Sequence, residues 1–254
     1  PWFLESRSSR DNPKRAWYVW ADSRPDGGPP NNWMSSFPRA GRAWTFDEAT
    51  GQWYLHSFMP EQPDLNWWNP EVREAMDQVM RFWLDRGVDG FRVDVAHKMA
   101  HDPELRDNPL VELDDEELGE APEARSRRLA KLKSIPRRDE DWPEVHEILR
   151  RFRRTLDAYD DRMAVGEVYL LDLVRLSRYY GSGQDEFHLV HNFVFQSQPW
   201  KAEAFRAVVD EFTGLLPAGA WPAWMLSNHD VSRIASRYDE GGHGPARARV
   251  AAML

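Results

Sequence analysis

The sequence predicts an α/β protein built around a parallel sheet, and three observations support this class. From about residue 69 onwards, helical patterns of hydrophobic residues alternate with short apolar runs, as they do in successive βα units. Several of these runs end in a carboxylate, and parallel α/β folds keep their reactive side chains at such strand ends. The length of 254 residues fits one large domain, or a domain that carries an inserted lobe.

Residues 1–66 differ in composition from the rest of the chain. They are rich in Pro, Gly, Trp and Asn and contain only short strand-like pieces, at 17–20 and 52–56. Frequent turn residues of this kind are typical of loops and small strands. We therefore predict an irregular lobe over 1–66 and the main α/β body over 67–254.

The main body begins with a clear helix pattern. Asn69 can cap this helix, Pro70 suits its first turn and Gly87 closes it. A strand is expected next, over 88–96. Residues 102–141 are then heavily charged, which favours a solvated loop or surface helix, although a long excursion can also roof a pocket.

The remaining elements alternate in the same way, which supports the parallel sheet. In chain order they are a helix opened by Pro143, a strand over 163–168, a helix near 172–180, a strand near 187–195, a helix from Phe205 to Phe212 and a strand near 221–226.

Bulk properties exclude several classes of partner. The 33 basic and 42 acidic residues give a net charge of -9, so nucleic acid is not an expected partner. No run of about 18 apolar residues is present, so no membrane segment is expected. The chain has no Cys, which excludes a disulfide framework and favours the cytoplasm. The sequence does not give the oligomeric state.

The strand expected over 88–96 carries a charged pair. Side chains alternate along a strand, so Arg92 and Asp94 share one face. A neighbouring guanidinium favours the ionised carboxylate, so Asp94 is expected to be anionic, as a nucleophile must be. Because a parallel strand is buried on both faces, the alternative is a plain buried ion pair.

Two further segments place polar groups at strand ends. Glu167 follows Gly166, which leaves room for a close approach. A carboxyl group in apolar surroundings near other acids has a raised pKa and donates a proton readily, although Glu167 could instead cap the following helix. His229 and Asp230 follow the last strand and could bind neighbouring hydroxyls and stabilise positive charge, but a His–Asp pair alone is common.

The combination of three carboxylates with an arginine and a histidine suits the making and breaking of a sugar acetal bond. A retaining glycosidase needs an anionic nucleophile and a protonated acid roughly 5–5.5 Å apart. Strand ends of one parallel barrel can supply both groups from distant positions in the sequence. His191 and Asn192 are polar as well, but core or capping roles are favoured for them.

These segments resemble the α-amylase superfamily of glycoside hydrolases (family 13), and within it the α-glucosidase and oligo-1,6-glucosidase branch. Gly-Phe-Arg-Val-Asp at 90–94 resembles the motif with the nucleophile and its arginine. Gly-Glu-Val at 166–168 resembles the acid/base segment, and Ser-Asn-His-Asp at 227–230 resembles the segment with a stabilising aspartate. Gln-Pro-Asp-Leu-Asn at 62–66 resembles a marker of this branch. The resemblance covers essentially the whole chain.

The resemblance implies roles for individual residues. Asp94 would be the nucleophile, Glu167 the general acid/base and Asp230 the stabiliser of the transition state. The residues implied to contact the nucleophile or the substrate are Arg92, His229, Val95 and Arg233. In having Val95 directly after the implied nucleophile, the chain resembles family members that cleave α-1,6 bonds. At this position, α-1,4 maltases more typically have a small polar residue. No metal or cofactor is implied within the chain, and calcium could bind only outside it.

By the same resemblance, the chain would hold part of a (β/α)₈ TIM barrel. Residues 1–66 would belong to the lobe inserted between barrel strand 3 and helix 3. Residues 67–254 would form the middle of the barrel, about strands 4 to 7, with the first family motif and the closing strand beyond the two ends. Such an open sheet exposes edges and apolar faces, so the isolated fragment is expected to be inactive and poorly soluble.

The implied activity is that of a retaining α-glucosidase. It would remove terminal α-1,6- or α-1,4-linked glucose from an oligosaccharide or disaccharide by double displacement. A rival with the same covalent intermediate passes the glucose to a sugar, as in trehalose synthase or sucrose isomerase, and no motif separates the two. A non-catalytic, transporter-associated relative is disfavoured because all three carboxylates are present. A nucleotide-binding protein is disfavoured because no Gly-rich phosphate loop follows a strand.

Overall fold

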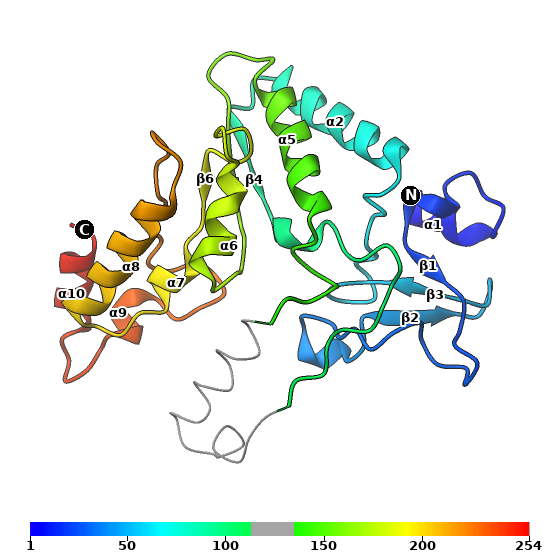
Figure 1. Ribbon diagram of the computed structural model, residues 1–254, viewed down its shortest axis with the longest axis horizontal. Helices are drawn as coiled ribbons and strands as arrows, with labels where there is room; N and C mark the ends of the chain where they lie inside the picture. Colours follow the sequence, from blue (N-terminus) through cyan, green and yellow to red (C-terminus); the bar gives the residue numbers. More distant parts are fainter. Residues whose placement is uncertain (113–134, 254) are drawn as a thin grey trace. The chain divides into compact units, whose positions relative to one another are not determined.

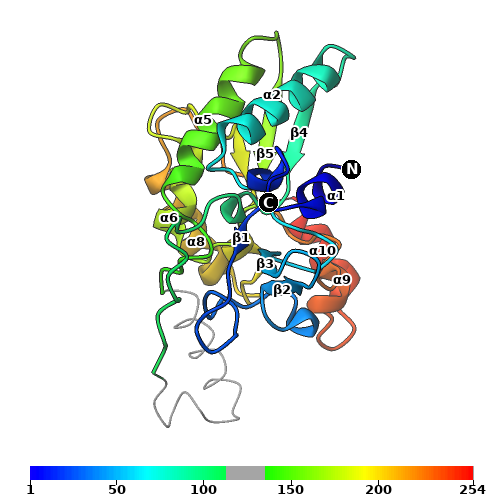
Figure 2. The same ribbon diagram turned by 90° about the vertical axis from the view of Figure 1, so that its right-hand side faces the viewer.

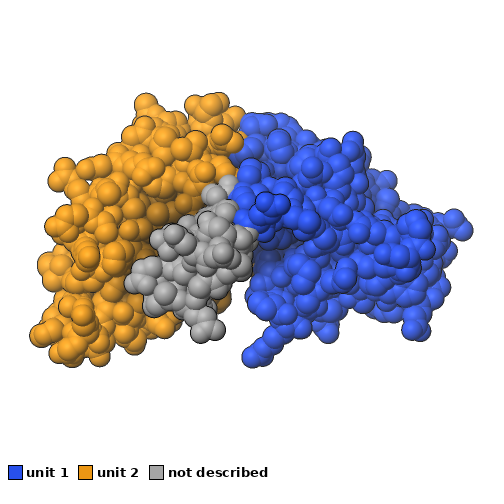
Figure 3. Space-filling view, turned by 60° about the horizontal axis from the view of Figure 1, so that its bottom comes forward, with its two compact units in different colours: residues 1–90, 95–162 blue, residues 91–94, 163–254 orange. Residues whose placement is uncertain are grey.

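The computed structural model describes residues 1–112 and 135–253 and divides into two compact units (Figure 3). Unit 1 comprises Pro1–Gly90 and Val95–Arg162, and unit 2 comprises Phe91–Asp94 and Met163–Leu254. The domain boundary expected after residue 66 falls inside unit 1 and stays a prediction.

Unit 1 contains a three-stranded antiparallel sheet with the order β1-β3-β2 (Figure 1). Its first elements are α1 (Trp2–Ser8), β1 (Trp20–Ala21), β2 (Trp44–Asp47) and β3 (Gln52–Leu55). The strand-like piece expected at 52–56 is confirmed as β3. The piece expected at 17–20 is mostly wrong, because a 3₁₀ helix (Arg15–Trp17) precedes β1. The helix α1 was not predicted, because the composition of the lobe indicated loops and strands only.

Tryptophan side chains form the core of this lobe. Trp33 and Trp44 are 0% and 3% exposed and pack with Val19 and Leu55. Each indole N–H finds an acceptor: that of Trp33 donates to the carbonyl of Arg106 at 2.9 Å, and that of Trp44 donates to Asn31 Oδ1 at 2.8 Å. Large aromatic side chains can therefore be buried here without leaving their polar atoms unpaired.

Next in unit 1 come α2 (Pro70–Leu84) and α5 (Glu144–Leu156), which lie side by side (Figures 1 and 2). Asn69 caps α2 as predicted, because its side chain accepts a hydrogen bond from the amide of Glu71. The closing residue, Gly87, has a φ of 88°, which favours glycine. The helix expected after Pro143 is confirmed as α5, and its apolar face is buried.

The charged stretch expected over 102–141 is only partly described. Residues 103–112 and 135–141 contain no regular helix or strand, as expected for a loop. The acidic and basic halves of this stretch fall mainly within 113–134, outside the described residues, so the idea of a roof over a pocket stays untested.

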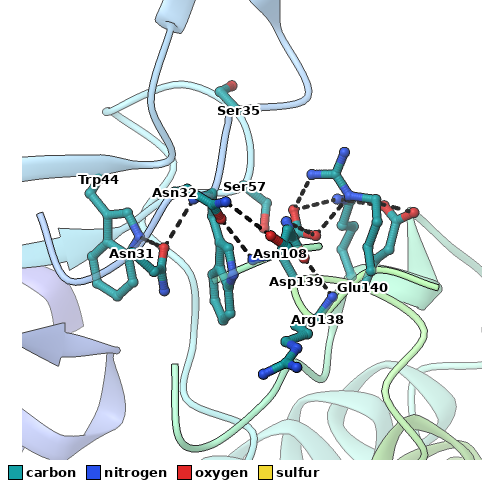
Figure 4. A network of polar contacts seen from close by, with 12 residues as sticks. Asn31, Asn32, Ser35, Trp44, Ser57, Asn108, Arg138, Asp139 and Glu140 are labelled. Carbon is teal, nitrogen blue, oxygen red and sulfur yellow. Dashed lines mark hydrogen bonds and ion pairs between the residues drawn. The ribbon is translucent and has the colours of Figure 1, made fainter. Parts of the chain in front are cut away.

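A buried charge network joins the two described parts of this stretch to the lobe (Figure 4). Asp139 is 5% exposed and accepts two hydrogen bonds from Arg137, at 2.8 and 2.6 Å, and one from Asn108, at 2.9 Å. Lys98 lies 3.6 Å from Asp139 and 2.7 Å from Glu140. Paired and hydrogen-bonded in this way, the buried charges remain tolerable.

Asn108 extends this network toward the lobe (Figure 4). Its amide donates to Asn32 Oδ1 at 2.7 Å, and Asn32 Nδ2 donates to the Asn108 carbonyl at 3.0 Å. The same Asn108 side chain accepts from the amide of Arg138 at 2.6 Å. Two irregular segments that are distant in sequence are thus held by reciprocal amide hydrogen bonds rather than by a strand ladder.

Unit 2 is built on a sheet of the order β4-β5-β6, in which β5 and β6 are parallel. Its elements are β4 (Gly90–Val93, of which Gly90 belongs to unit 1), β5 (Met163–Gly166), α6 (Leu173–Ser177), β6 (Leu189–Val190), α7 (Phe193–Gln196), α8 (Ala202–Leu215), α9 (Ile234–Arg237) and α10 (Gly244–Ala251). The alternation of strands and helices confirms the α/β class; the partial (β/α)₈ barrel, about strands 4 to 7, stays a prediction.

Several strands of unit 2 are shorter than expected, and local capping explains one case. The strand expected near 187–195 ends at Val190, because Asn192 caps α7 by accepting a hydrogen bond from the Phe195 amide at 2.9 Å. The strand expected near 221–226 is reduced to one parallel bridge between His191 and Ala223. The helix expected near 172–180 continues beyond α6 as a 3₁₀ helix.

An aromatic core supports the sheet of unit 2. Tyr180 is 1% exposed and packs edge-on against Phe212, which is fully buried. The Tyr180 hydroxyl donates to the carbonyl of Trp221 at 3.1 Å and accepts from the Val190 amide at 3.2 Å. Burial raises the pKa of this hydroxyl to about 12. In the described part of the chain, no helix has the length and hydrophobicity to cross a membrane.

The charge network of unit 1 gives a testable pH dependence. Burial by itself raises the pKa of Asp139, but hydrogen bonds from Arg137 and the charge of Lys98 outweigh it and lower the pKa to about 2. A depressed pKa stabilises the fold above the ordinary value of 3.8, and this stabilisation disappears as the pH falls toward 2. We expect Asp139→Asn to lower the free energy of unfolding by about 2 kcal/mol at pH 7, measured by urea denaturation.

The difference between wild type and Asp139→Asn should shrink steadily from pH 5 downward, because the wild-type carboxylate becomes protonated. The matched control is Asp157→Asn, which removes an exposed pair with Arg153 and should change stability by less than about 1 kcal/mol. A loss that is the same at pH 7 and pH 3 would contradict the role given to the ionised carboxylate.

Candidate active site

Arg92 joins two carboxyl groups from neighbouring strands of unit 2. It lies in β4, and its Nη1 contacts Asp94, the residue just beyond the end of this strand. Its Nη2 lies 2.9 Å from Oε1 of Glu167, the residue just beyond the end of β5. Backbone pairing sets the two strand ends side by side, because the Glu167 amide donates to the Val93 carbonyl at 2.9 Å.

Exposure differs between the members of this group. The side chain of Glu167 is 8% exposed, whereas those of Arg92 and Asp94 are 38% and 66% exposed. Burial of the charged pair on both faces of the strand, expected from the sequence, is therefore wrong. Asp94 follows the last residue of β4, where the chain leaves the sheet. A plain buried ion pair does not describe the contact between Arg92 and Asp94.

The electrostatics of the group favour an anionic Asp94. Burial raises its pKa, but a hydrogen bond with Glu167 and the charge and hydrogen bond of Arg92 outweigh this and hold the pKa below its ordinary value. The charge of His229 acts in the same direction. A hydrogen bond between two carboxyl groups requires a proton on one of them. A retaining mechanism needs that proton on Glu167, and the lowered pKa favours the ionised form of Asp94.

The third carboxylate lies in an exposed segment after the Ala223 bridge. Asp230 accepts a hydrogen bond from Asn228 Nδ2 at 3.0 Å, and its amide donates to Asn228 Oδ1 at 3.1 Å. His229 Nε2 lies 3.5 Å from Asp230 Oδ1. Because the charge of His229 influences Asp94, this segment is linked electrostatically to the group around Arg92.

Two other predicted site residues occupy distinctive backbone positions. Val95, directly after Asp94, has φ 38° and ψ 44°, a left-handed conformation that β-branched residues rarely adopt. It belongs to unit 1, and its substrate contact stays a prediction. Arg233 precedes α9 and donates to the carbonyl of Asn228 at 3.4 Å, so it holds the segment that carries Asp230.

His191 lies beside this group, although the sequence analysis favoured a core or capping role for it. The parallel register places Gly166 opposite Val190, and its next step pairs Glu167 with His191. The signal was present in the sequence, since His191 also ends an apolar run.

Among the described residues, neither a metal-binding cluster nor a pocket adds a residue to this site. No group of three or more His, Cys, Asp or Glu side chains within 1–112 and 135–253 is arranged to hold a metal ion. A pocket of about 770 Å³ in unit 2 is lined mainly by aromatic and aliphatic side chains, among them Phe195, Trp200, Phe205 and Trp224. It includes none of the seven residues predicted from the sequence.

Known proteins resemble this chain over nearly all of its length. The family model described as "Alpha amylase, catalytic domain" matches residues 1–254. A "probable alpha-glucosidase" of Rhizobium meliloti (strain 1021) is 44% identical over 95% of the chain and 43% of its own length. An oligo-1,6-glucosidase of Parageobacillus thermoglucosidasius is 36% identical over 100% of the chain and 43% of its own length.

A solved structure shares the fold of the chain. The crystal structure of the α-glucosyl transfer enzyme XgtA superimposes with a TM-score of 0.79 at 40% identity, covering 95% of this chain and 43% of XgtA. The chain thus spans less than half the length of each of these relatives.

The close packing behind Glu167 provides a stability prediction. A Cβ atom on Gly166 would lie 2.4 Å from ring carbons of Phe187, which is 2% exposed. The close approach expected at this glycine is therefore that of a buried aromatic ring. We expect Gly166→Ala to lower the free energy of unfolding by about 1–3 kcal/mol, because the ring must move; thermal unfolding measures the loss.

Two further variants make this test specific. Gly183→Ala is the matched control, since a Cβ there meets no atom within 4 Å, and we expect it to leave stability nearly unchanged. Gly166→Ala combined with Phe187→Leu should recover part of the loss, because the smaller side chain frees space. The packing argument would fail if Gly166→Ala and Gly183→Ala had equal effects.

Proposed function

Because the chain belongs to the α-amylase family through its catalytic domain, we propose that it provides the catalytic centre of a retaining α-glucosidase. The substrate would be a short oligosaccharide or disaccharide with a terminal α-linked glucose. The observation that carries the proposal is the group around Arg92, in which Asp94, with a lowered pKa, lies beside the buried Glu167. A retaining mechanism requires an anionic nucleophile and a protonated acid, so the proposal places the proton on Glu167.

In the first step, an oxygen of Asp94 attacks the anomeric carbon of the glucose, and the bond to the leaving sugar breaks. Glu167 gives its proton to the departing glycosidic oxygen. Arg92 keeps Asp94 ionised before the attack and compensates the negative charge that develops on Glu167. The product of this step is a covalent glucosyl ester of Asp94.

In the second step, Glu167 accepts a proton from water, and the water oxygen attacks the anomeric carbon. The ester bond to Asp94 breaks and glucose leaves with its original anomeric configuration. In the transition state of each step, Asp230 would stabilise the positive charge that develops on the ring, and His229 would bind a glucose hydroxyl. The two hydrogen bonds between Asn228 and Asp230 orient Asp230 for this role.

A second candidate is transfer of the glucose to another sugar rather than to water. The similarity to an enzyme named for α-glucosyl transfer supports this second candidate. Both reactions share the covalent intermediate and the groups Asp94 and Glu167. They differ only in the acceptor of the second step. Product analysis with maltose or sucrose separates them: a disaccharide isomer without free glucose supports transfer.

The nucleophile assignment gives a first test in the full-length protein. We expect Asp94→Asn to reduce turnover of p-nitrophenyl α-glucoside by at least about 10³-fold, because an amide does not form the glucosyl ester. Treatment of the wild type with 5-fluoro-α-D-glucosyl fluoride should attach one glucosyl group to Asp94, detected by peptide mass spectrometry.

The matched control is Asp210→Asn, which changes an exposed carboxylate on α8 and should preserve both turnover and labelling. Circular dichroism should show the same folded spectrum for both variants. Near-normal turnover by Asp94→Asn, or labelling at another carboxylate, would remove the assignment.

The position of Val95 gives a test of linkage preference. We expect the full-length wild type to have a higher kcat/KM for isomaltose than for maltose. Val95→Thr has nearly the same shape but adds a hydroxyl, and it should shift this ratio several-fold toward maltose. Val174→Thr, on the exposed side of α6, is the control and should leave the ratio unchanged. A strong preference of the wild type for maltose would refute the role of Val95.

A further inference from the structure

A third strand places a polar side chain beside the group around Arg92. On the parallel strands β5 and β6, Gly166 pairs with Val190, so the next step of the register pairs Glu167 with His191. The amide of His191 donates to the Gly166 carbonyl at 3.0 Å, which continues the ladder by this step. Paired residues on adjacent strands point to the same face of a sheet. His191 and Glu167 are therefore neighbours on one face.

The surroundings of His191 keep its imidazole neutral. Burial lowers the pKa of the ring, and the positive charge of Arg92 lowers it further. A neutral imidazole has one nitrogen that donates and one that accepts, so it binds neutral hydroxyl groups without adding charge to the site.

One of the two ring nitrogens has its hydrogen-bonding capacity unused. Nδ1 of His191 is buried and has no hydrogen-bond partner within the described residues 1–112 and 135–253. The next residue, Asn192, points to the opposite face and caps α7. Buried polar atoms are nearly always paired in folded proteins, and functional sites are where exceptions are expected.

We propose that His191 is a substrate-binding residue whose Nδ1 forms a hydrogen bond with a hydroxyl of the glucose held between Asp94 and Glu167. The inference rests on the proposed function and deepens it by adding a contact from a third strand. A sugar hydroxyl both donates and accepts, so it pairs with Nδ1 in either tautomer of the neutral ring. The contact would complete the hydrogen bonding of His191 when substrate is bound.

The test compares His191→Phe with wild type in the full-length protein on p-nitrophenyl α-glucoside and its 2-, 3-, 4- and 6-deoxy analogues. Phenylalanine keeps a ring of similar size and removes both nitrogens. We expect kcat/KM for the parent glucoside to fall about tenfold or more. For the one analogue that lacks the contacted hydroxyl, the kcat/KM values of His191→Phe and wild type should agree within about twofold.

Three further variants separate a hydrogen bond from a packing role. His191→Asn places a polar atom at the δ position of the side chain, whereas His191→Gln places it at the ε position. We expect Asn to retain more of the activity than Gln, and this comparison stands even if the Phe variant does not fold. His243→Phe changes an exposed histidine and should leave all five substrates unaffected.

Either of two results would overturn the inference while leaving the proposed function intact. The first is an unchanged kcat/KM in His191→Phe. The second is an equal loss on the parent and on every deoxy analogue, together with a moved basic limb of the pH profile, which would mean that the ring acts only through Glu167. Failure of the proposed function is distinct, because wild type would then hydrolyse none of the glucosides, and both proposals would fall.

Discussion

Two carboxyl groups at neighbouring strand ends repel each other when both are ionised, and the site depends on how this repulsion is resolved. Here one guanidinium, that of Arg92, contacts both groups. A hydrogen bond with Glu167 and the charge of Arg92 hold the pKa of the exposed Asp94 below its ordinary value. The side chain of Glu167 is 8% exposed, and burial disfavours the ionised form of a carboxyl group. The two carboxyl groups thus differ in their surroundings, as the proposed nucleophile and acid must.

The sheet supplies the precision that this arrangement requires. Strands β4, β5 and β6 are only two to four residues long, yet backbone hydrogen bonds set their ends side by side. The Glu167 amide donates to the Val93 carbonyl, and the His191 amide donates to the Gly166 carbonyl. Behind this row, Gly166 lets the ring of Phe187 pack directly on the backbone of β5. The hydrophobic contacts of these short strands are made away from their ends, as by the Phe187 ring. The strand ends therefore remain free for polar groups.

Unit 1 uses buried charge differently. There, Asp139 and Glu140 are fully matched by Lys98, Arg137 and amide donors, so their role is to join irregular segments. In unit 2, Nδ1 of His191 is buried and unpaired among the described residues. Complete pairing suits a structural network, whereas incomplete pairing leaves capacity for a ligand.

Local sequence determined the features that depend on neighbouring residues alone. The Asn69 cap, the α2 and α5 helices and the shared face of Arg92 and Asp94 followed from spacing, and the family resemblance rested on short motifs and is confirmed. The strand after residue 187 was predicted too long, because capping by Asn192 competes locally with pairing.

Tertiary structure alone decided the exposure of Asp94, the burial of Glu167 and the position of His191 beside it. Each of these depends on the register between strands and on burial, which arise from contacts between segments that are distant in the sequence.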